Sequence, residues 1–152
     1  MTSDDVTIKN IRVEGCGDTT GYNAFQVKGD DVTIENVLAK TCSKGVSIEG
    51  SGAWVGNSTF SNNHHNGVEI WGGDSTTTAV KIYKNNIWWN GNVGIKSSED
   101  DVIIKSNRIS NNSQEGIYLD GAADAVIDSN TIVDNDKAVS YTHLTLPTIY
   151  SV

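Results

Sequence analysis

Two stretches near the N-terminus decide the fold, because they are nearly the same sequence written twice. "SDDVTIKNIRVEGC" occupies residues 3–16, and "GDDVTIENVLAKTC" occupies residues 29–42. The offset between them is 26 residues, and it places Cys16 on Cys42. Self-similarity at a fixed period of this size is typical of solenoids and other repeat arrays, in which one short unit cannot bury its apolar face alone.

Looser copies of the same unit continue along the chain. They read "AWVGNSTFSNN" (53–63), "VKIYKNNIWWN" (80–90), "VIIKSNRISNN" (102–112) and "AVIDSNTIVDN" (125–135). Aligning them gives one recurring turn column, with steps of 26, 22, 27, 22 and 23 residues, formed by Asn10, Asn36, Ser58, Asn85, Asn107 and Asn130. Apolar and polar residues alternate within each unit, and this period of two predicts strands with one face inside.

Stacking these units predicts an all-β solenoid of about five to six rungs, in which each strand pairs in parallel with the rungs on either side. Aliphatic residues would fill the interior. The chain holds 16 Asn, concentrated at the turns, where stacked amides can bond to each other along the axis. An antiparallel β-sandwich is the alternative, but it would not need a fixed residue column.

The repeated "N-x-I-x-x-N…G-[VI]-x-[IL]" units resemble the right-handed parallel β-helix proteins of the pectate-lyase-like group, over residues 1 to about 137. The resemblance implies a right-handed parallel β-helix and a secreted protein of the extracellular space or cell surface. It implies no single activity, because enzymes and purely structural stalks share this fold.

The chain is expected to be a fragment, truncated at both ends. Residues 1–138 are assigned to the β-helix and residues 139–152 to a non-native tail, because the repeat stops after Lys137 and the only proline lies at Pro147. "VSYTHLTLPT" (139–148) is similar to the in-frame translation of a transposase-derived sequencing adapter; a genuine terminal strand is the alternative. Met1 aligns with Val27, a strand position inside a rung.

Composition and net charge restrict the classes of partner that the chain is expected to bind. The formal net charge is −8, which disfavours binding to nucleic acid. The chain contains no run of about 18 apolar residues, so no membrane span is expected. A polysaccharide is the candidate partner, and the oligomeric state is left open.

The alignment predicts which strand residues point outward beside the second segment of each unit. One outward column is Gln26, Ser47, Glu69, Lys96 and Tyr118, and the next is Lys28, Glu49, Trp71, Ser98 and Asp120. The inward columns are Phe25, Val46, Val68, Ile95 and Ile117, then Val27, Ile48, Ile70, Ser97 and Leu119. Candidate site residues are therefore sought on the outward columns, beside the longer segment 72–78.

The resemblance to β-helix lyases implies the chemistry of this patch. Those enzymes neutralise a uronate carboxylate with calcium, and a Lys or Arg removes the adjacent proton. We expect Lys96 and Glu69 as candidate catalytic residues, although the same two residues are also placed to form a plain cross-strand ion pair. Candidate substrate-binding residues are Trp71, Tyr118, Asp120, His64 and His65. The Asp cluster of such lyases, and the paired carboxylates of glycoside hydrolases, are not recognisable.

The sequence predicts no resident metal site and no cofactor. Calcium is the candidate ion that its acidic turns could bind. His64 and His65 are adjacent and lack an evident third ligand. Acidic pairs recur at one turn, at Asp4–Asp5, Asp30–Asp31 and Asp100–Asp101, with Asp124 in the next unit. Their oxygens are ligands that calcium accepts, so a bridging ion between rungs is an expectation to examine.

Cys16 and Cys42 occupy equivalent positions in adjacent units, which would bring their Cα atoms within disulfide range. Two stacked, buried thiols are the alternative. Trp88 and Trp89 are consecutive, so alternation predicts one ring inside and the other outside.

The sequence thus supports two functions of different classes. One is a fragment of a secreted carbohydrate-binding or carbohydrate-processing β-helix protein, of the polysaccharide lyase or glycoside hydrolase kind if it is an enzyme. The other is a non-catalytic structural or adhesive surface β-helix.

Overall fold

A computed structural model describes residues 4–17, 21–71 and 78–142, and within them the chain forms eighteen short strands in three six-stranded sheets. Sheet A contains β1 (Thr7–Lys9), β4 (Thr33–Glu35), β7 (Trp54–Gly56), β10 (Lys81–Tyr83), β13 (Ile103–Lys105) and β16 (Val126–Asp128). Sheet B contains β2 (Arg12–Glu14), β5 (Leu38–Lys40), β8 (Thr59–Ser61), β11 (Asn86–Trp88), β14 (Arg108–Ser110) and β17 (Thr131–Val133). Sheet C contains β3 (Phe25–Val27), β6 (Val46–Ile48), β9 (Val68–Ile70), β12 (Ile95–Ser97), β15 (Glu115–Asp120) and β18 (Lys137–Thr142).

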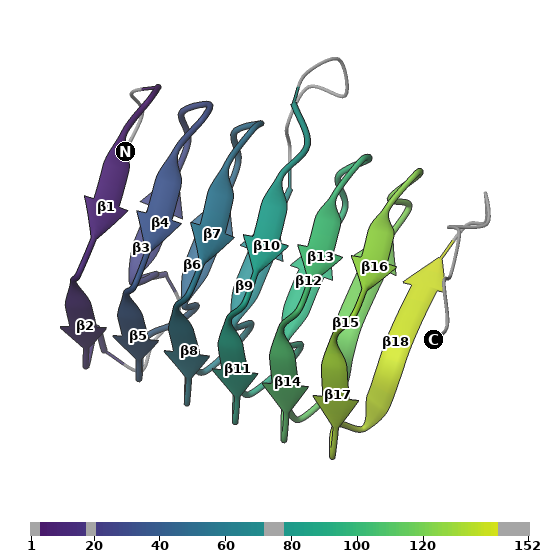
Figure 1. Cartoon of the computed structure of the whole chain (residues 1–152). Helices are drawn as coiled ribbons and strands as arrows, with labels where there is room; N and C mark the ends of the chain where they lie inside the picture. The colour runs from purple at the N-terminus through teal and green to yellow at the C-terminus, as the bar shows by residue number, and fades with distance from the viewer. Residues whose placement is uncertain (1–3, 18–20, 72–77, 143–152) are drawn as a thin grey trace.

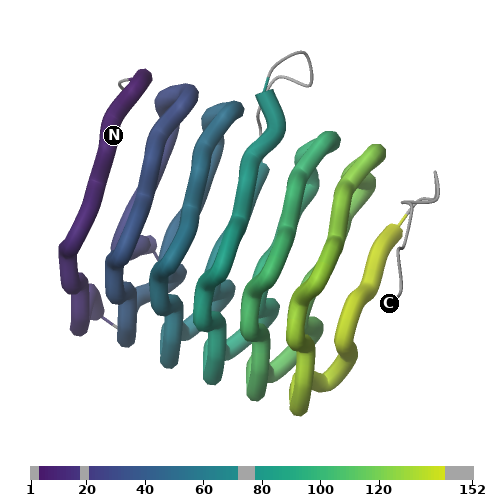
Figure 2. Tube along the Cα trace, viewed as in Figure 1, coloured from purple at the N-terminus to yellow at the C-terminus, as the bar shows by residue number. Residues whose placement is uncertain are grey.

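The chain winds as a coil, and each turn contributes one strand to every sheet (Figures 1 and 2). All strand pairs are parallel; Ile82 of β10 pairs with Ile104 of β13, and Ile87 of β11 pairs with Ile109 of β14. The predicted parallel solenoid of about six rungs is confirmed, and the antiparallel sandwich is excluded. The described residues include no helix that could span a membrane.

Stacked aliphatic side chains fill the interior of the coil. In sheet A, Ile34, Val55, Ile82 and Ile104 lie one above another and are fully buried. The two predicted inward columns of sheet C are confirmed by the strand register. Burial of one such side chain contributes about 1.5–3 kcal/mol, so the repeated column supplies most of the driving force for stacking.

The corner between sheets A and B is always two residues long. Its first residue has a left-handed backbone in every rung, with φ between 51° and 58°, at Asn10, Asn36, Asn57, Lys84, Ser106 and Ser129. Its second residue points inward, and from the third rung onward this position holds Ser58, Asn85, Asn107 and Asn130. Asn85 Nδ2 donates to Asn107 Oδ1 at 3.0 Å, and Asn107 Nδ2 donates to Asn130 Oδ1 at 3.0 Å.

The predicted turn column was therefore wrong in its first two members. Asn10 and Asn36 occupy the exposed, left-handed position and stack with Asn57, whereas the second corner position of those rungs holds Ile11, which is exposed in the first rung, and Val37, which is buried. Val37 N donates to Ser58 Oγ at 3.1 Å, across a separation of 21 residues. The step from the second to the third rung is thus 21 rather than 22, because Thr33 pairs with Trp54.

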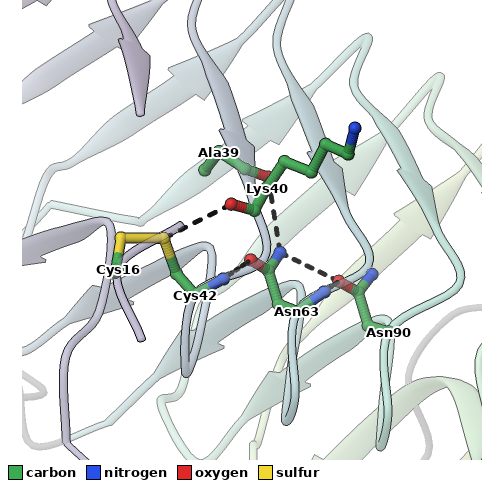
Figure 3. Close-up of a disulfide and its surroundings, with 6 residues drawn as sticks. All are labelled: Cys16, Ala39, Lys40, Cys42, Asn63 and Asn90. Atoms are coloured by element: carbon green, nitrogen blue, oxygen red, sulfur yellow. Dashed lines mark hydrogen bonds between the residues drawn. A yellow bond between two sulfur atoms is a disulfide. The ribbon is translucent and has the colours of Figure 1, made fainter. Parts of the chain in front are cut away.

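The corner between sheets B and C carries a second buried amide column, formed by Asn63, Asn90, Asn112 and Asn135. At its end, Cys42 N donates to Asn63 Oδ1 at 3.1 Å (Figure 3). Cys42 is bonded to Cys16, with Cα atoms 4.6 Å apart, so the disulfide tie between the first two rungs is present and the free-thiol alternative is not. The disulfide occupies the place of the asparagines in this column.

The segment assigned to a non-native tail lies mostly outside the described residues. Of residues 139–152, only 139–142 are described, and they continue β18 beside β15, with Val139 opposite Ile117. Residues 143–152 are outside the described ranges, as are residues 72–77 of the longer segment after Trp71.

Candidate functional site

The outward face of sheet C brings the predicted site residues together. Ser47 pairs with Glu69, Glu69 with Lys96, and Lys96 with Tyr118, so the first predicted outward column is a real column on adjacent strands. These strands form because β-branched and aliphatic residues alternate with polar ones, which turns the apolar set inward and leaves the polar set outside.

Two adjoining hollows run along this face, with volumes of 530 Å³ and 360 Å³, and we call them together the sheet C groove. Lys44, Glu69 and Lys96 line both hollows. The larger hollow extends toward the corner from sheet B and is also lined by Asn23, His65, Asn66, Asn92, Gln114, Glu115 and Tyr118. The smaller hollow extends the other way and is also lined by Trp71, Ser98 and Asp120.

Glu69 is held in place at the middle of the groove. Lys44 forms an ion pair with its carboxylate, and Asn66 Nδ2 donates to Glu69 Oε1 at 3.0 Å. The Glu69 side chain is only 14% exposed, so this pair is better shielded from solvent than a surface salt bridge. The alternative pairing of Glu69 with Lys96 is not what the structure contains.

Lys96 lies on the next strand and contacts an aromatic ring instead. Its Nζ lies 5.7 Å from the centroid of the Tyr118 ring, within the range of a cation–π contact. None of the ion pairs among the described residues includes Lys96. It is therefore the cation of this groove that is available to an anionic group of a ligand.

Trp71 presents an indole ring at the other end of the groove. It is 46% exposed, and its Nε1 donates at 3.1 Å to Ser47 Oγ on the adjacent strand β6. Ser47 points outward yet is only 1% exposed. The hydrogen bond fixes the ring on the sheet while leaving apolar surface in solvent, a preorganised arrangement for stacking.

The remaining predicted site residues, Asp120, His65 and His64, lie at different places relative to the two hollows. Asp120 accepts a hydrogen bond from Thr142 Oγ1 at 2.8 Å and lines the smaller hollow. His65 lines the larger hollow, with its Nδ1 atom 3.1 Å from Ser43 Oγ. His64 is exposed and does not line either hollow. The two histidines therefore do not line the same hollow.

Comparison with known proteins agrees with this architecture. The profile of a family described as "Right handed beta helix region" matches residues 1–150. The chain belongs to the right-handed beta-helix family. Neither a search of curated proteins nor a search of solved structures gave a match.

Sequence reasoning missed the groove residues at the corner of this beta-helix. Lys44, Asn66 and Glu115 all directly precede the Gly that opens a sheet C strand, and Lys137 occupies the same place in the next rung, where its Nζ lies 3.2 Å from Glu115 Oε1. Their shared position directly before a Gly was the sequence signal that could have identified them as groove residues. It predicts a third column at the edge of the sheet, in which Asn66 is buried.

Paired charges also occupy the far edge of the groove face. Lys28 Nζ lies 3.0 Å from Glu49 Oε2, and Gln26 Nε2 donates to Glu49 Oε1 at 3.0 Å. The hydrogen bond from Lys28 is the main reason that the pKa of Glu49 lies below its ordinary value, although burial opposes the shift.

The acidic turns of this beta-helix accept hydrogen bonds from the next rung. Asp4 Oδ1 accepts from Asp30 N at 2.9 Å, and Asp30 Oδ1 accepts from Ser51 N at 2.8 Å and from Ser51 Oγ at 2.9 Å. The bond from Ser51 N is the largest cause of the lowered pKa of Asp30. Within residues 4–17, 21–71 and 78–142, no group of three or more His, Cys, Asp or Glu side chains is placed to hold a metal ion.

Proposed function

We propose that the sheet C groove binds a polysaccharide chain, and that this beta-helix is part of a secreted carbohydrate-binding or carbohydrate-processing protein. The observation that carries the proposal is the fixed, half-exposed Trp71 ring beside a polar groove. Sugar rings present an apolar face that packs on an indole, and hydroxyl groups at their edges that need hydrogen-bond partners.

The groove offers those partners in number. Asn66, Asn92 and Gln114 line the larger hollow, and Asp120 and Ser98 line the smaller one. Amide and carboxylate groups both accept from sugar hydroxyls, and amides also donate. A chain laid along the groove would cross successive rungs, so repeated sugar units would meet repeated strands.

Lys96 is the candidate residue for chemistry on a bound uronate. As a cation without an ion-pair partner among the described residues, it could attract a sugar carboxylate, or in its neutral form accept the proton beside that carboxylate. Glu69 serves a different role in this proposal, because Lys44 and Asn66 hold its carboxylate. It positions Lys44 at the groove floor. The proposal assigns no site to a bridging calcium ion. Calcium is instead added to the assay as a separate condition.

A secreted location fits the disulfide, because such bonds persist in oxidising compartments and are rare in the cytosol.

The competing function is a structural or adhesive β-helix without chemistry. It is favoured by the ion pairs that already neutralise Glu69 and Glu115 in the groove and Glu49 elsewhere on the same sheet. If all groove charges serve to hold adjacent rungs together, then no saccharide should bind there.

Titration with oligosaccharides separates the two functions. A panel of neutral and uronate-containing oligomers is added to the wild-type chain while tryptophan fluorescence is recorded. Binding should change the fluorescence, and Trp71→Ala should reduce that change by removing the sheet C contribution, whereas the control Trp54→Phe on the outer face of sheet A should preserve it. An equal response in wild type and Trp71→Ala would reject the sheet C groove as the site.

The same samples test for chemistry. Cleavage of a uronate by elimination creates a conjugated double bond that absorbs in the ultraviolet, and it should appear with the wild type and vanish with Lys96→Met. Calcium is added in one arm and a chelator in another. Binding without any absorbance change in either arm would leave a binding module and reject Lys96 as a base.

A further inference from the structure

Sheet B carries a pair of tryptophans that the groove on sheet C does not use. Trp88 is the last residue of β11 and Trp89 follows it, with ring centroids 5.2 Å apart and ring planes tilted by 60°. Trp89 is 57% exposed, more than Trp71, and Trp88 lies at an outward position beside the buried Ile87. Neither ring belongs to the core, so the expectation that one faces inward is wrong.

Trp89 also has an unfavourable backbone conformation. Its φ is +53°, in the left-handed region, which bulky side chains rarely adopt. The same corner position in the other rungs is also left-handed, and it holds the small residues Gly15, Thr41, Asn62, Asn111 and Asp134. Because the Trp89 ring is more than half exposed, core packing does not compensate for this strain. A strained backbone under an exposed aromatic ring is the kind of outlier that points to function.

A hollow of 420 Å³ lies beside the two rings, and we call it the sheet B groove. It is lined by Leu38, Thr59 and Asn62 and by the charged residues Arg12, Glu14 and Lys40. Arg12 Nη2 lies 2.7 Å from Glu14 Oε1, and Lys40 Nζ lies 3.8 Å from the same oxygen. Two cations therefore share one carboxylate, which leaves a local excess of positive charge.

The excess continues on the other side of Trp88. Arg108 lies on the next strand and lines a further hollow of 320 Å³ with Asn86, Trp88 and Ser110. The outward positions of the six sheet B strands hold three cationic side chains and a single carboxylate, Glu14. The cations are Arg12, Lys40 and Arg108. This face is cationic although the chain as a whole carries a net charge of −8.

We infer that the sheet B groove is a second carbohydrate-binding surface, selective for an anionic oligosaccharide. A sugar ring stacks on the exposed face of Trp89, and its carboxylate lies toward Arg12 and Lys40. Aromatic stacking supplies the contact area, and the local cations supply the preference for negative charge. This inference does not rest on the sheet C proposal, because no residue is shared between the two grooves.

The chain itself supplies the substitutions for the test. Ser61 and Ser110 flank Trp88 in the register, and Asn62 and Asn111 occupy the corner positions equivalent to Trp89. Trp88→Ser and Trp89→Asn therefore install residues that neighbouring rungs already accept. Far-ultraviolet circular dichroism confirms folding, and Trp89→Asn alone carries the test if the double variant fails to fold.

Binding is measured by calorimetry in the Trp71→Ala background, which removes the sheet C ring. Oligogalacturonate should bind, and Trp88→Ser with Trp89→Asn should weaken the affinity about tenfold or more. Trp54→Phe should leave the affinity unchanged. Arg12→Gln with Lys40→Gln should weaken oligogalacturonate binding more than binding of a neutral galacto-oligosaccharide of the same length.

Three results would overturn the inference. The first is no binding of oligogalacturonate to the Trp71→Ala protein. The second is an unchanged affinity after both sheet B tryptophans are replaced in a folded variant. The third is equal affinity for neutral and anionic oligomers. The sheet C proposal is judged separately, from the effect of Trp71→Ala in the otherwise wild-type chain.

Discussion

Removal of one amide from the second buried column should destabilise the solenoid strongly. Asn90 is 1% exposed and connects three rungs. Its Oδ1 accepts from Asn63 N at 3.1 Å and from Asn63 Nδ2 at 2.9 Å. Its Nδ2 donates to Phe60 O at 3.2 Å and to Asn112 Oδ1 at 2.9 Å.

Asn90→Ala removes all four hydrogen bonds at once. Asn63 N is left buried without its acceptor, and a buried donor left unsatisfied costs about 1–3 kcal/mol. The other three bonds add smaller losses, since their partners keep some alternative contacts; Asn63 Nδ2, for example, still donates to Ala39 O at 3.4 Å. We expect the free energy of unfolding to fall by about 3–5 kcal/mol, a large part of the stability of an ordinary domain.

Urea denaturation followed by tryptophan fluorescence measures this loss, with variants compared at equal slope. Asn86→Ala is the matched control, because Asn86 lies on β11 close to Asn90 but is exposed; it should change stability by about 0.5 kcal/mol or less. Asn90→Ser should fall between the two, since Ser58 Oγ accepts from a backbone N–H at the equivalent place in the other column. A loss below about 1 kcal/mol for Asn90→Ala would refute the view that the amide column holds the rungs together.

Three further outcomes are expected. Trp89→Asn should raise the free energy of unfolding by about 1 kcal/mol, because Asn tolerates the left-handed backbone better than Trp; a lower melting temperature would contradict this. Reduction of the Cys16–Cys42 bond, which closes a separation of 26 residues, should cost up to about 3.5 kcal/mol, and thiol counting on denatured, unreduced protein should find no free thiol. Stability should fall with acid below about pH 4.5, because the pKa of Glu49 is lowered in the folded state by Lys28: its contribution is complete above the unfolded-state pKa and is lost as the pH falls through the folded-state pKa. Glu49→Gln should flatten that part of the profile.

The stacked positions were predictable because adjacent units repeat the same alternation. The repeat predicts the register of sheet C. It therefore also predicts that Glu69 lies beside Lys96 on adjacent strands. Cys16 and Cys42 were the clearest case, since equal offsets in parallel rungs bring equivalent Cα atoms to about one strand spacing. Local pattern and tertiary stacking agree here, which is why sequence alone was sufficient.

Errors arose where two neighbouring residues were both plausible at a corner. Asn57 and Ser58 are adjacent, and either could continue a column of turn residues. Only the backbone shows that Asn57 has a positive φ and points outward while Ser58 is buried. A shift of one residue exchanges the inside for the outside.

The partner of Glu69 could not be predicted for a related reason. Lys96 is its neighbour in the strand register, but Lys44 reaches it from the corner before the previous sheet C strand. The ion-pair partner of a long, flexible side chain depends on where the corner places neighbouring residues. Strand alternation does not describe the corner. Trp89 is similar, because its exposure follows from a left-handed corner that interrupts the alternation.

The corners also differ in how much extra chain they accept. The corner from sheet A to sheet B holds two residues in every rung, whereas ten residues separate β9 from β10 and five separate β12 from β13. An inserted residue at the first corner would displace a buried amide, but one at the corner from sheet C to sheet A would only lengthen a loop. New binding specificities can therefore evolve beside the sheet C groove by insertion and deletion, without any change in the coil that supports it.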